Sequence, residues 1–189
     1  MRPATAQTEL LKTTMIRRAH GFALIDLVFV CGVIGVLCSI AIPRLLLAKQ
    51  SAGAASAIGS MRVINSAQLT FALTCGSGFY APNLTTLGAP PAGSREGFLG
   101  GDLGAADTVT KSGYVIQLDA APFAGAPGSC NNLNPGLGGQ GYRAAADPAD
   151  STNPRFFGIN SNGQIWEHNA TLFASMPELA DPPIGHPLR

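Results

Sequence analysis

The four cysteines are the side chains of this 189-residue chain that are best suited to covalent chemistry. Cys31 and Cys38 lie seven positions apart in an apolar stretch. On a helix that spacing separates them by about 10 Å along the axis, too far for a disulfide. Cys75 and Cys130 lie outside the stretch, and two cysteines without Cys or His neighbours make a poor zinc site. We predict a Cys75–Cys130 disulfide if this part of the chain faces an oxidising compartment.

The remaining candidates for enzymatic or cofactor chemistry lack the arrangement that such chemistry needs. The histidines, at positions 20, 168 and 186, have no metal-ligand spacing, and no G-x-S-x-G or paired-carboxylate pattern occurs. Residues 136–141 spell G-x-G-x-x-G, but they follow Asn134-Pro135 and precede a candidate strand. A phosphate cradle needs that motif between a strand and a helix. We therefore expect no enzyme activity, no metal and no cofactor.

The balance of charge argues against nucleic acid as the main partner. The chain has 12 Lys and Arg against 11 Asp and Glu, a net charge of +1. Basic residues are concentrated before Phe22, where Lys12, Arg17 and Arg18 lie. Arg62 and Lys111 are interpreted as solvated charges, because nucleic-acid binding requires a basic patch.

Residues 22–42 form an apolar run whose single charge is Asp26. As a helix this run is about 30 Å long, enough to cross the core of a bilayer. It is longer than the apolar region of a signal peptide, and no A-x-A cleavage site closes it before Pro43. Arg17 and Arg18 precede it, so we expect the N-terminus in the cytoplasm and the remainder outside.

Placing the charge of Asp26 in a membrane costs free energy. An ionised carboxylate near the bilayer centre costs at least about 2.5–3.5 kcal/mol, and less toward the interface. Residues 22–42 contain no Lys or Arg that could pair with it. A free α-amino group made by cleavage just before Phe22 could do so, from the same chain or from a neighbour.

Residues 21–43, from Gly21 to Pro43, resemble the prepilin signature of type IV pilins and type II secretion pseudopilins. The shared features are a basic leader ending in Gly, then Phe, an acidic fifth residue, an apolar run and a following Pro. The resemblance implies that a prepilin peptidase cuts between Gly21 and Phe22 and N-methylates Phe22. It also implies that Asp26 pairs with the Phe22 amine of an adjacent subunit. The family usually has Glu at this position, so Asp26 keeps the charge with a shorter reach.

The resemblance divides the chain into four parts. Residues 1–21 are the leader, unless Met15 is the true start, which would give the short basic leader M-I-R-R-A-H-G. Residues 22–47 are the transmembrane and assembly half of a long helix. Residues 48–75 are its amphipathic half, and residues 76–189 are a globular head with a Pro-rich tail. Pro43 should kink or locally open the helix.

The amphipathic half is predicted to end near Cys75, with Gly76 as its C-terminal cap. Apolar residues recur there at spacings of three and four and form one stripe, which we expect to pack on a sheet. The stripe comprises Ala54, Ala57, Met61, Ile64, Ala67 and Phe71. Off the stripe or at its edge lie Arg62, Asn65 and Gln68.

The head is predicted to be an antiparallel sheet of three to four strands, which makes the class α+β. The resemblance implies that this arrangement is a pilin fold. Residues 76–110, rich in Gly and Pro, are interpreted as a long surface connection. A few apolar residues are expected to anchor it, namely Phe79, Leu84, Leu87, Phe98 and Leu99. Strands are predicted at 114–119, 142–146, 155–159 and 164–168. The last two flank Asn162-Gly163, the strongest hairpin signal in the chain. The tail from Pro177 should be extended.

These features predict a structural subunit of a type IV pilus-like filament. Its partners would be prepilin peptidase, identical subunits and the inner-membrane assembly machinery. It would reside in the bacterial inner membrane as a precursor, then in an extracellular pilus or a periplasmic pseudopilus. Residues 56–68 and 161–166 are similar to PilA-like pilins of soil and sediment bacteria. A type II secretion pseudopilin, a minor pilin and a tethered periplasmic binding module remain the alternatives.

Overall fold

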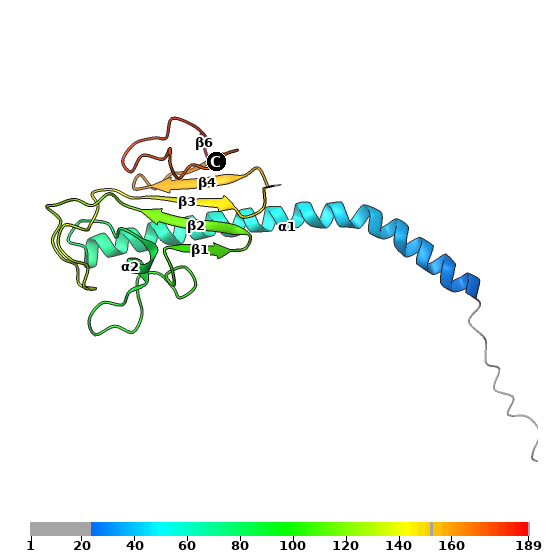
Figure 1. Ribbon diagram of the computed structural model, residues 1–189, viewed down its shortest axis with the longest axis horizontal. Helices are drawn as coiled ribbons and strands as arrows, with labels where there is room; N and C mark the ends of the chain where they lie inside the picture. The colour runs from blue at the N-terminus through cyan, green and yellow to red at the C-terminus, as the bar shows by residue number, and fades with distance from the viewer. Residues whose placement is uncertain (1–23, 152, 189) are drawn as a thin grey trace, which may run out of the picture. The chain divides into compact units, whose positions relative to one another are not determined.

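The computed structural model describes residues 24–151 and 153–188, and these form two compact units that divide between Leu45 and Leu46. Helix α1, Leu24–Thr74, contributes to both units (Figure 1). We call residues 24–45 the exposed segment and residues 46–188 the folded unit. Gly21 and Phe22, the predicted processing site, lie outside the described residues.

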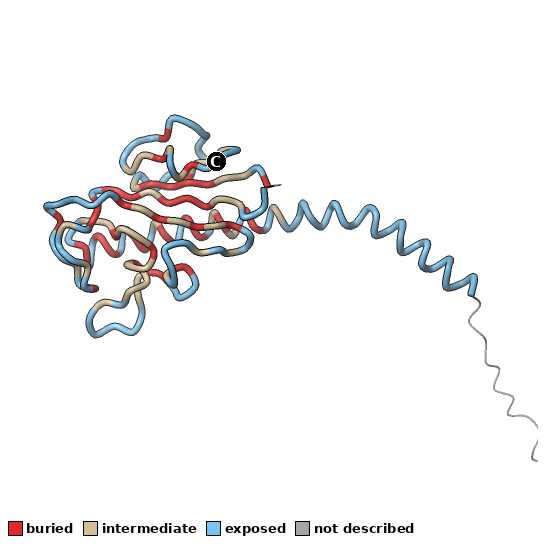
Figure 2. The backbone as a smooth tube through the Cα atoms, viewed as in Figure 1, coloured by how far each residue is buried: buried red, intermediate tan, exposed pale blue. Residues whose placement is uncertain are grey.

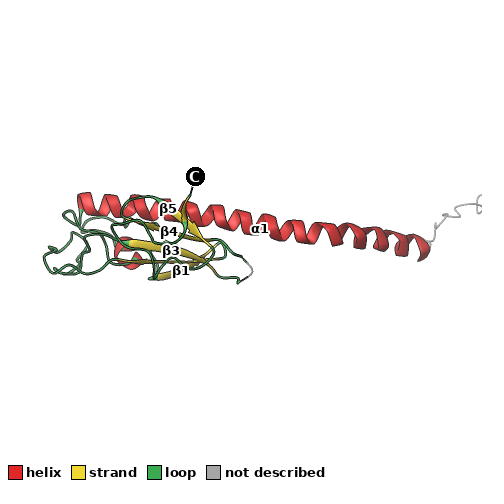
Figure 3. Cartoon of the chain, turned by 90° about the horizontal axis from the view of Figure 1, so that it is seen from above, coloured by secondary structure: helices red, strands yellow, loops and turns green. Residues whose placement is uncertain are grey.

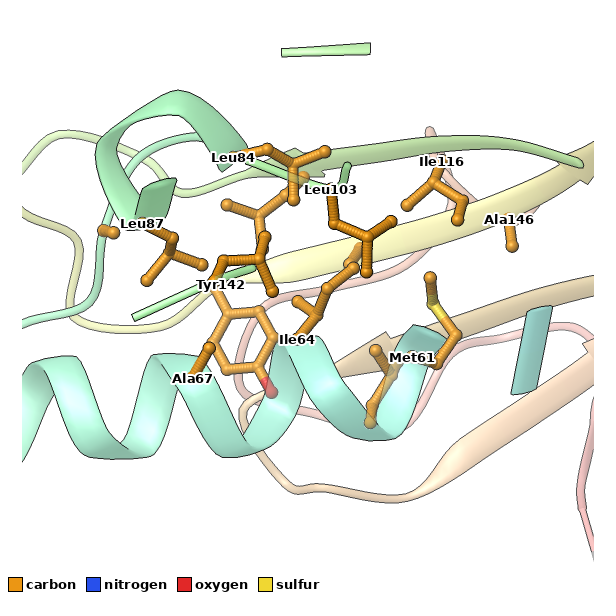
Figure 4. Packing of buried hydrophobic residues seen from close by; sticks show 14 of the residues in the cluster. Met61, Ile64, Ala67, Leu84, Leu87, Leu103, Ile116, Tyr142 and Ala146 are labelled. Atoms are coloured by element: carbon orange, nitrogen blue, oxygen red, sulfur yellow. The ribbon is translucent and has the colours of Figure 1, made fainter. Parts of the chain in front are cut away.

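The amphipathic part of α1 supplies one side of the core of the folded unit. All six residues of the predicted stripe are buried, and Met61, Ile64 and Phe71 have no exposed surface. Figure 4 shows Met61 and Ile64 packed among residues of the sheet and of the connecting segment. The helix ends at Thr74, as predicted within a residue, because Ser77 and Gly78 then take positive φ angles of 52° and 93°. Gly76 does not take a positive φ. Instead, an added Cβ there would lie 2.2 Å from the carbonyl oxygen of Phe79.

The sheet is antiparallel and has six strands in chain order, so the prediction of three to four strands was wrong in number (Figure 3). The strands are β1 (Thr108–Lys111), β2 (Tyr114–Asp119), β3 (Arg143–Pro148), β4 (Phe156–Asn160), β5 (Ile165–His168) and β6 (His186–Pro187). The four predicted strands correspond to β2, β3, β4 and β5. Val109 is the only large apolar residue of β1, and β6 is a two-residue pairing inside the Pro-rich tail, so neither carries an alternating pattern.

Two tight turns set the register of the sheet. The predicted hairpin at Asn162-Gly163 is confirmed: it joins β4 to β5, and Gly163 has a φ of 76°. A second turn, at Ser112 and Gly113, joins β1 to β2 with φ angles of 51° and 81°. Two consecutive positive φ angles are the geometry of a two-residue hairpin loop whose twist matches that of the strands.

Most of residues 76–110 are exposed or half-buried, but this long connection also contributes side chains to the core. It contains the short helix α2 (Leu84–Gly88), whose N-cap Asn83 accepts a hydrogen bond from the backbone N–H of Thr86. Four leucines of this segment are buried, namely Leu84, Leu87, Leu99 and Leu103. Gly88 and Gly104 let two backbone stretches cross here, because a Cβ on Gly88 would lie 2.4 Å from the Gly104 oxygen.

The predicted disulfide between Cys75 and Cys130 is confirmed. It connects the end of α1 to the loop between β2 and β3, and the backbone N–H of Cys130 also donates to the Cys75 oxygen at 3.2 Å. Because 55 positions separate the two cysteines, closing this loop stabilises the fold by about 4 kcal/mol in the chain-entropy model.

On the face of the sheet that points away from α1, the segment after β5 covers β4 and contacts β3. Phe157 and Ile159 of β4 belong to the core cluster with α1, so Gly158 between them points to the opposite face. Leu172 and Met176 lie on that face and are buried. A Cβ on Gly158 would meet Met176 at 2.6 Å, so glycine there allows the segment to pack directly on β4. Figure 2 shows the resulting buried central strands.

Gln68 of α1 is buried, whereas the sequence placed it at the edge of the stripe. Its side-chain nitrogen donates to the Ala81 oxygen at 2.8 Å, and its side-chain oxygen accepts from the Ala81 backbone N–H at 2.9 Å. Gln68 and Ala81 have no exposed surface. The Gln68 amide therefore pairs with both the N–H and the C=O of Ala81, in the segment that returns along the helix.

We expect Gln68→Leu to lower the free energy of unfolding by about 2–5 kcal/mol, because it leaves two buried backbone groups without a partner. Unfolding by urea in detergent, followed through the fluorescence of Trp166, measures this; Trp166 is the only tryptophan. Gln50→Leu on the same helix is the control, since Gln50 is partly exposed, and should change stability by at most about 0.5 kcal/mol. Equal effects of the two variants would contradict the assignment.

Candidate assembly helix

The exposed segment of α1 presents apolar side chains on all of its faces. Every residue from Leu24 to Leu45 is exposed, and Leu24, Ile25 and Phe29 each have more than 70% of their surface exposed. By length and composition, α1 is apolar enough to cross a membrane. An all-round apolar helix is stable only when lipid or protein covers it.

The helical backbone of the exposed segment allows lipid or protein to cover it. A helix satisfies its backbone hydrogen bonds internally, so it can enter an apolar medium without unpaired N–H or C=O groups. The α-helix continues through Pro43, although proline removes one of these bonds. Ser39, four positions earlier, uses its hydroxyl to donate to the Val36 oxygen at 2.7 Å. The predicted kink at Pro43 stays a prediction.

Asp26 lies in the first turn of α1, where the positive end of the helix dipole favours a carboxylate. The only basic residue of the exposed segment is Arg44, eighteen positions later and about 27 Å along the axis. Within the described part of this segment, Asp26 therefore has no cationic partner within reach. Its predicted partner, the amine of Phe22, lies outside the described residues.

Small residues interrupt the apolar surface between Cys31 and Cys38. A Cβ on Gly32 or Gly35 would meet nothing within 4 Å, so both glycines face open space. Gly32 leaves a shallow hollow that Phe29, Val33 and Val36 also line. Small residues of this kind let a second helix approach closely in an apolar medium. Both cysteines are free thiols and exposed.

The other candidate residues from the sequence analysis that the structure describes lie in the folded unit. In the G-x-G-x-x-G stretch, the backbone of Gly139 exchanges two hydrogen bonds with Tyr80, at 2.9 and 3.0 Å. His168 ends β5 and His186 begins β6, while His20 lies outside the described residues. Among the residues that the structure describes, no three metal-ligating side chains come together. Arg62 is exposed, and Lys111 lies 3.9 Å from Asp102.

A polar cluster on the outer face of the sheet escaped the sequence analysis. Arg143 lies 2.8 Å from Asp119 and stacks over the ring of Phe173. Asp147 accepts a hydrogen bond of 2.6 Å from the hydroxyl of Thr171, and burial raises the pKa of this carboxyl. The available signal was the even spacing of Arg143 and Asp147, four positions apart, which places both charges on one face of β3.

Arg155, which directly precedes β4, and Glu167 of β5 form a second ion pair. The guanidinium donates to both carboxylate oxygens, at 2.6 and 3.1 Å. The hydrogen bond from Arg155 lowers the pKa of Glu167. Two parallel hydrogen bonds fix the relative position of the two side chains, so this pair ties the start of β4 to β5.

Comparisons of the chain with protein-family models, with curated proteins and with solved structures find no match. The resemblance of residues 21–43 to the prepilin signature therefore rests on the sequence itself.

The exposure of the two thiols predicts which cysteines react in the intact protein. In detergent micelles without reductant, we expect a small maleimide to modify Cys31 and Cys38 and to leave the disulfide-bonded pair unmodified. Mass spectrometry of peptides counts the modified sites, and Cys31→Ser with Cys38→Ser should abolish labelling. Labelling of Cys75 or Cys130 before reduction would contradict the structure.

Proposed function

We propose that this chain is a structural subunit of a type IV pilus-like filament. A prepilin peptidase removes residues 1–21 and methylates Phe22, and the subunit then assembles through the apolar half of its first helix. The observation that carries the proposal is the contrast within α1. One half holds the core of a folded unit, while the other half is apolar and exposed on every face.

The apolar half can be covered first by lipid and then by other subunits. Moving it from lipid tails into a bundle of identical helices exchanges one apolar medium for another, so the hydrophobic cost is small. The disulfide supports a location of the folded unit outside the cytoplasm, because disulfides persist in oxidising compartments. The precursor then resides in the inner membrane with its folded unit in the periplasm.

Asp26 gives the assembly its register. A carboxylate inside an apolar bundle needs a cation, and the exposed segment has none within reach. The α-amino group of Phe22 on the adjacent subunit supplies that cation after cleavage. Each subunit therefore enters at the one axial position where both charges are paired.

The intact mass of the protein tests processing and destination together. Filaments sheared from the native cells should contain a chain that lacks residues 1–21 and carries one extra methyl group. The same processed mass confined to the inner membrane would favour a pseudopilin or a minor pilin. An unprocessed chain in every fraction would overturn the proposal and favour a tethered periplasmic module.

Asp26→Ala should abolish filaments and leave the processed subunit in the membrane, because the buried amine of a neighbour loses its counter-ion. Asp26→Glu is the matched control: it keeps the charge, lengthens its reach, and should assemble at least as well as the wild type. Electron microscopy and the amount of protein in the sheared fraction measure assembly. Normal filaments of Asp26→Ala, with the Cys75–Cys130 disulfide intact, would contradict the role of this carboxylate.

A further inference from the structure

Two tripeptides of the form Asn-x-Thr occur in the chain, Asn83-Leu84-Thr85 and Asn169-Ala170-Thr171. This pattern is the acceptor sequence for asparagine-linked glycosylation, which occurs on surface segments of exported proteins. The relevance of the pattern rests on the proposed function, since that proposal places the folded unit outside the cytoplasm. The structure distinguishes the two tripeptides sharply.

The tripeptide Asn169-Ala170-Thr171 is presented to solvent. Asn169 and Ala170 form a bend directly after β5, and all three residues are exposed. Among the residues that the structure describes, the side-chain amide of Asn169 has no hydrogen-bond partner. Its nitrogen is therefore available without the loss of any contact.

Both ends of this tripeptide are fixed. On one side, Glu167 of β5 is held by the two hydrogen bonds from Arg155. On the other side, Leu172 is fully buried against β4. The acceptor is thus a short exposed bridge between two anchored residues, and an enzyme can bind it without unfolding the sheet.

The tripeptide Asn83-Leu84-Thr85 is committed to the fold. The side-chain oxygen of Asn83 caps α2 by accepting from the backbone N–H of Thr86 at 2.9 Å. Asn83 and Thr85 are half-buried, and Leu84 between them is fully buried. Releasing Asn83 removes the N-cap of α2 and pulls the buried Leu84 out of the core.

We propose that Asn169 is the site at which this subunit carries an asparagine-linked glycan, and that Asn83 remains unmodified. The donor is an oligosaccharide joined through a diphosphate to a membrane lipid, and a separate membrane transferase catalyses the step. The Asn169 amide nitrogen forms a bond to the anomeric carbon while the bond from that carbon to the diphosphate oxygen breaks. The lipid diphosphate leaves with the electron pair, and one amide proton passes to solvent.

The hydroxyl of Thr171 connects the acceptor to the outer face of the sheet. It donates to Asp147, whose side chain points away from α1 because Ala144 and Ala146 of the same strand lie in the core with α1. A glycan at Asn169 therefore begins near the face of the sheet opposite α1. That position leaves the helix free for contacts between subunits.

The test uses the full-length protein recovered from its native cell envelope. Intact mass and fragmentation of the peptide that contains Asn169 should show carbohydrate on this asparagine. Asn169→Gln and Thr171→Val should lose the carbohydrate completely, while Thr171→Ser, which keeps the hydroxyl, should retain it. Thr85→Val is the matched control, because it destroys the other acceptor sequence and should leave the carbohydrate mass unchanged.

The outcomes separate this inference from the proposed function. Wild-type protein without carbohydrate, or carbohydrate that persists in Asn169→Gln, overturns the inference. The same spectrum reports removal of residues 1–21 independently, so a processed but unglycosylated chain leaves the filament proposal standing. A glycosylated but unprocessed chain supports the modification and overturns the filament proposal. The Asn169→Gln chain should keep the wild-type unfolding midpoint, because Asn169 makes no contact that stabilises the fold.

Discussion

The structure depends on one helix that must satisfy two different surroundings. From Leu46 onward, α1 buries a stripe of small and large apolar residues against the sheet and leaves its other face exposed. Before that point, α1 is apolar on every face and is exposed within the described part of the chain. Since exposed apolar surface of this extent is unstable in water, the second requirement passes to a membrane or to other molecules. The fold is thus complete in one unit, while the exposed segment needs lipid or a neighbour.

In the folded unit, specific contacts hold the rest of the chain against α1. The stripe is rich in alanine, so the backbone of the helix comes close to the sheet, and Met61, Ile64 and Phe71 fill the space between. Gln68 adds a specific polar contact in the middle of that packing. The disulfide adds a covalent link at the C-terminal end of α1. Together these contacts hold the sheet, the segment after α1 and the loop between β2 and β3 against the helix.

The sequence predicted the elements whose patterns are periodic, and it missed those that depend on partners far away in the chain. The long helix, its stripe, β2 and the hairpin at Gly163 follow local rules of spacing and turn chemistry. Strand β1 has one large apolar residue, and it is held by pairing with β2. Leu84, Leu87 and Leu99 are the predicted anchors and are buried, but their irregular spacing gives no sign of the backbone crossing that Gly88 and Gly104 permit. Gln68 was misplaced for the same reason, because its partner Ala81 belongs to a returning segment.

The candidate site shows the same division between local and distant information. Adjacent residues are enough to identify the carboxylate of Asp26, the apolar run that follows it and Pro43. These features predict a helix whose apolar surface must be covered by lipid or protein. An exposed apolar surface shows that a covering is needed but does not identify it, so no pattern within one chain contains the answer. The two Asn-x-Thr tripeptides make the converse case, since the sequence gives both the same motif. Only the fold separates them, by using one asparagine as a helix cap above a buried leucine and leaving the other on an exposed bend. A local motif becomes a functional statement when the tertiary structure decides whether its residues are exposed or packed into the fold.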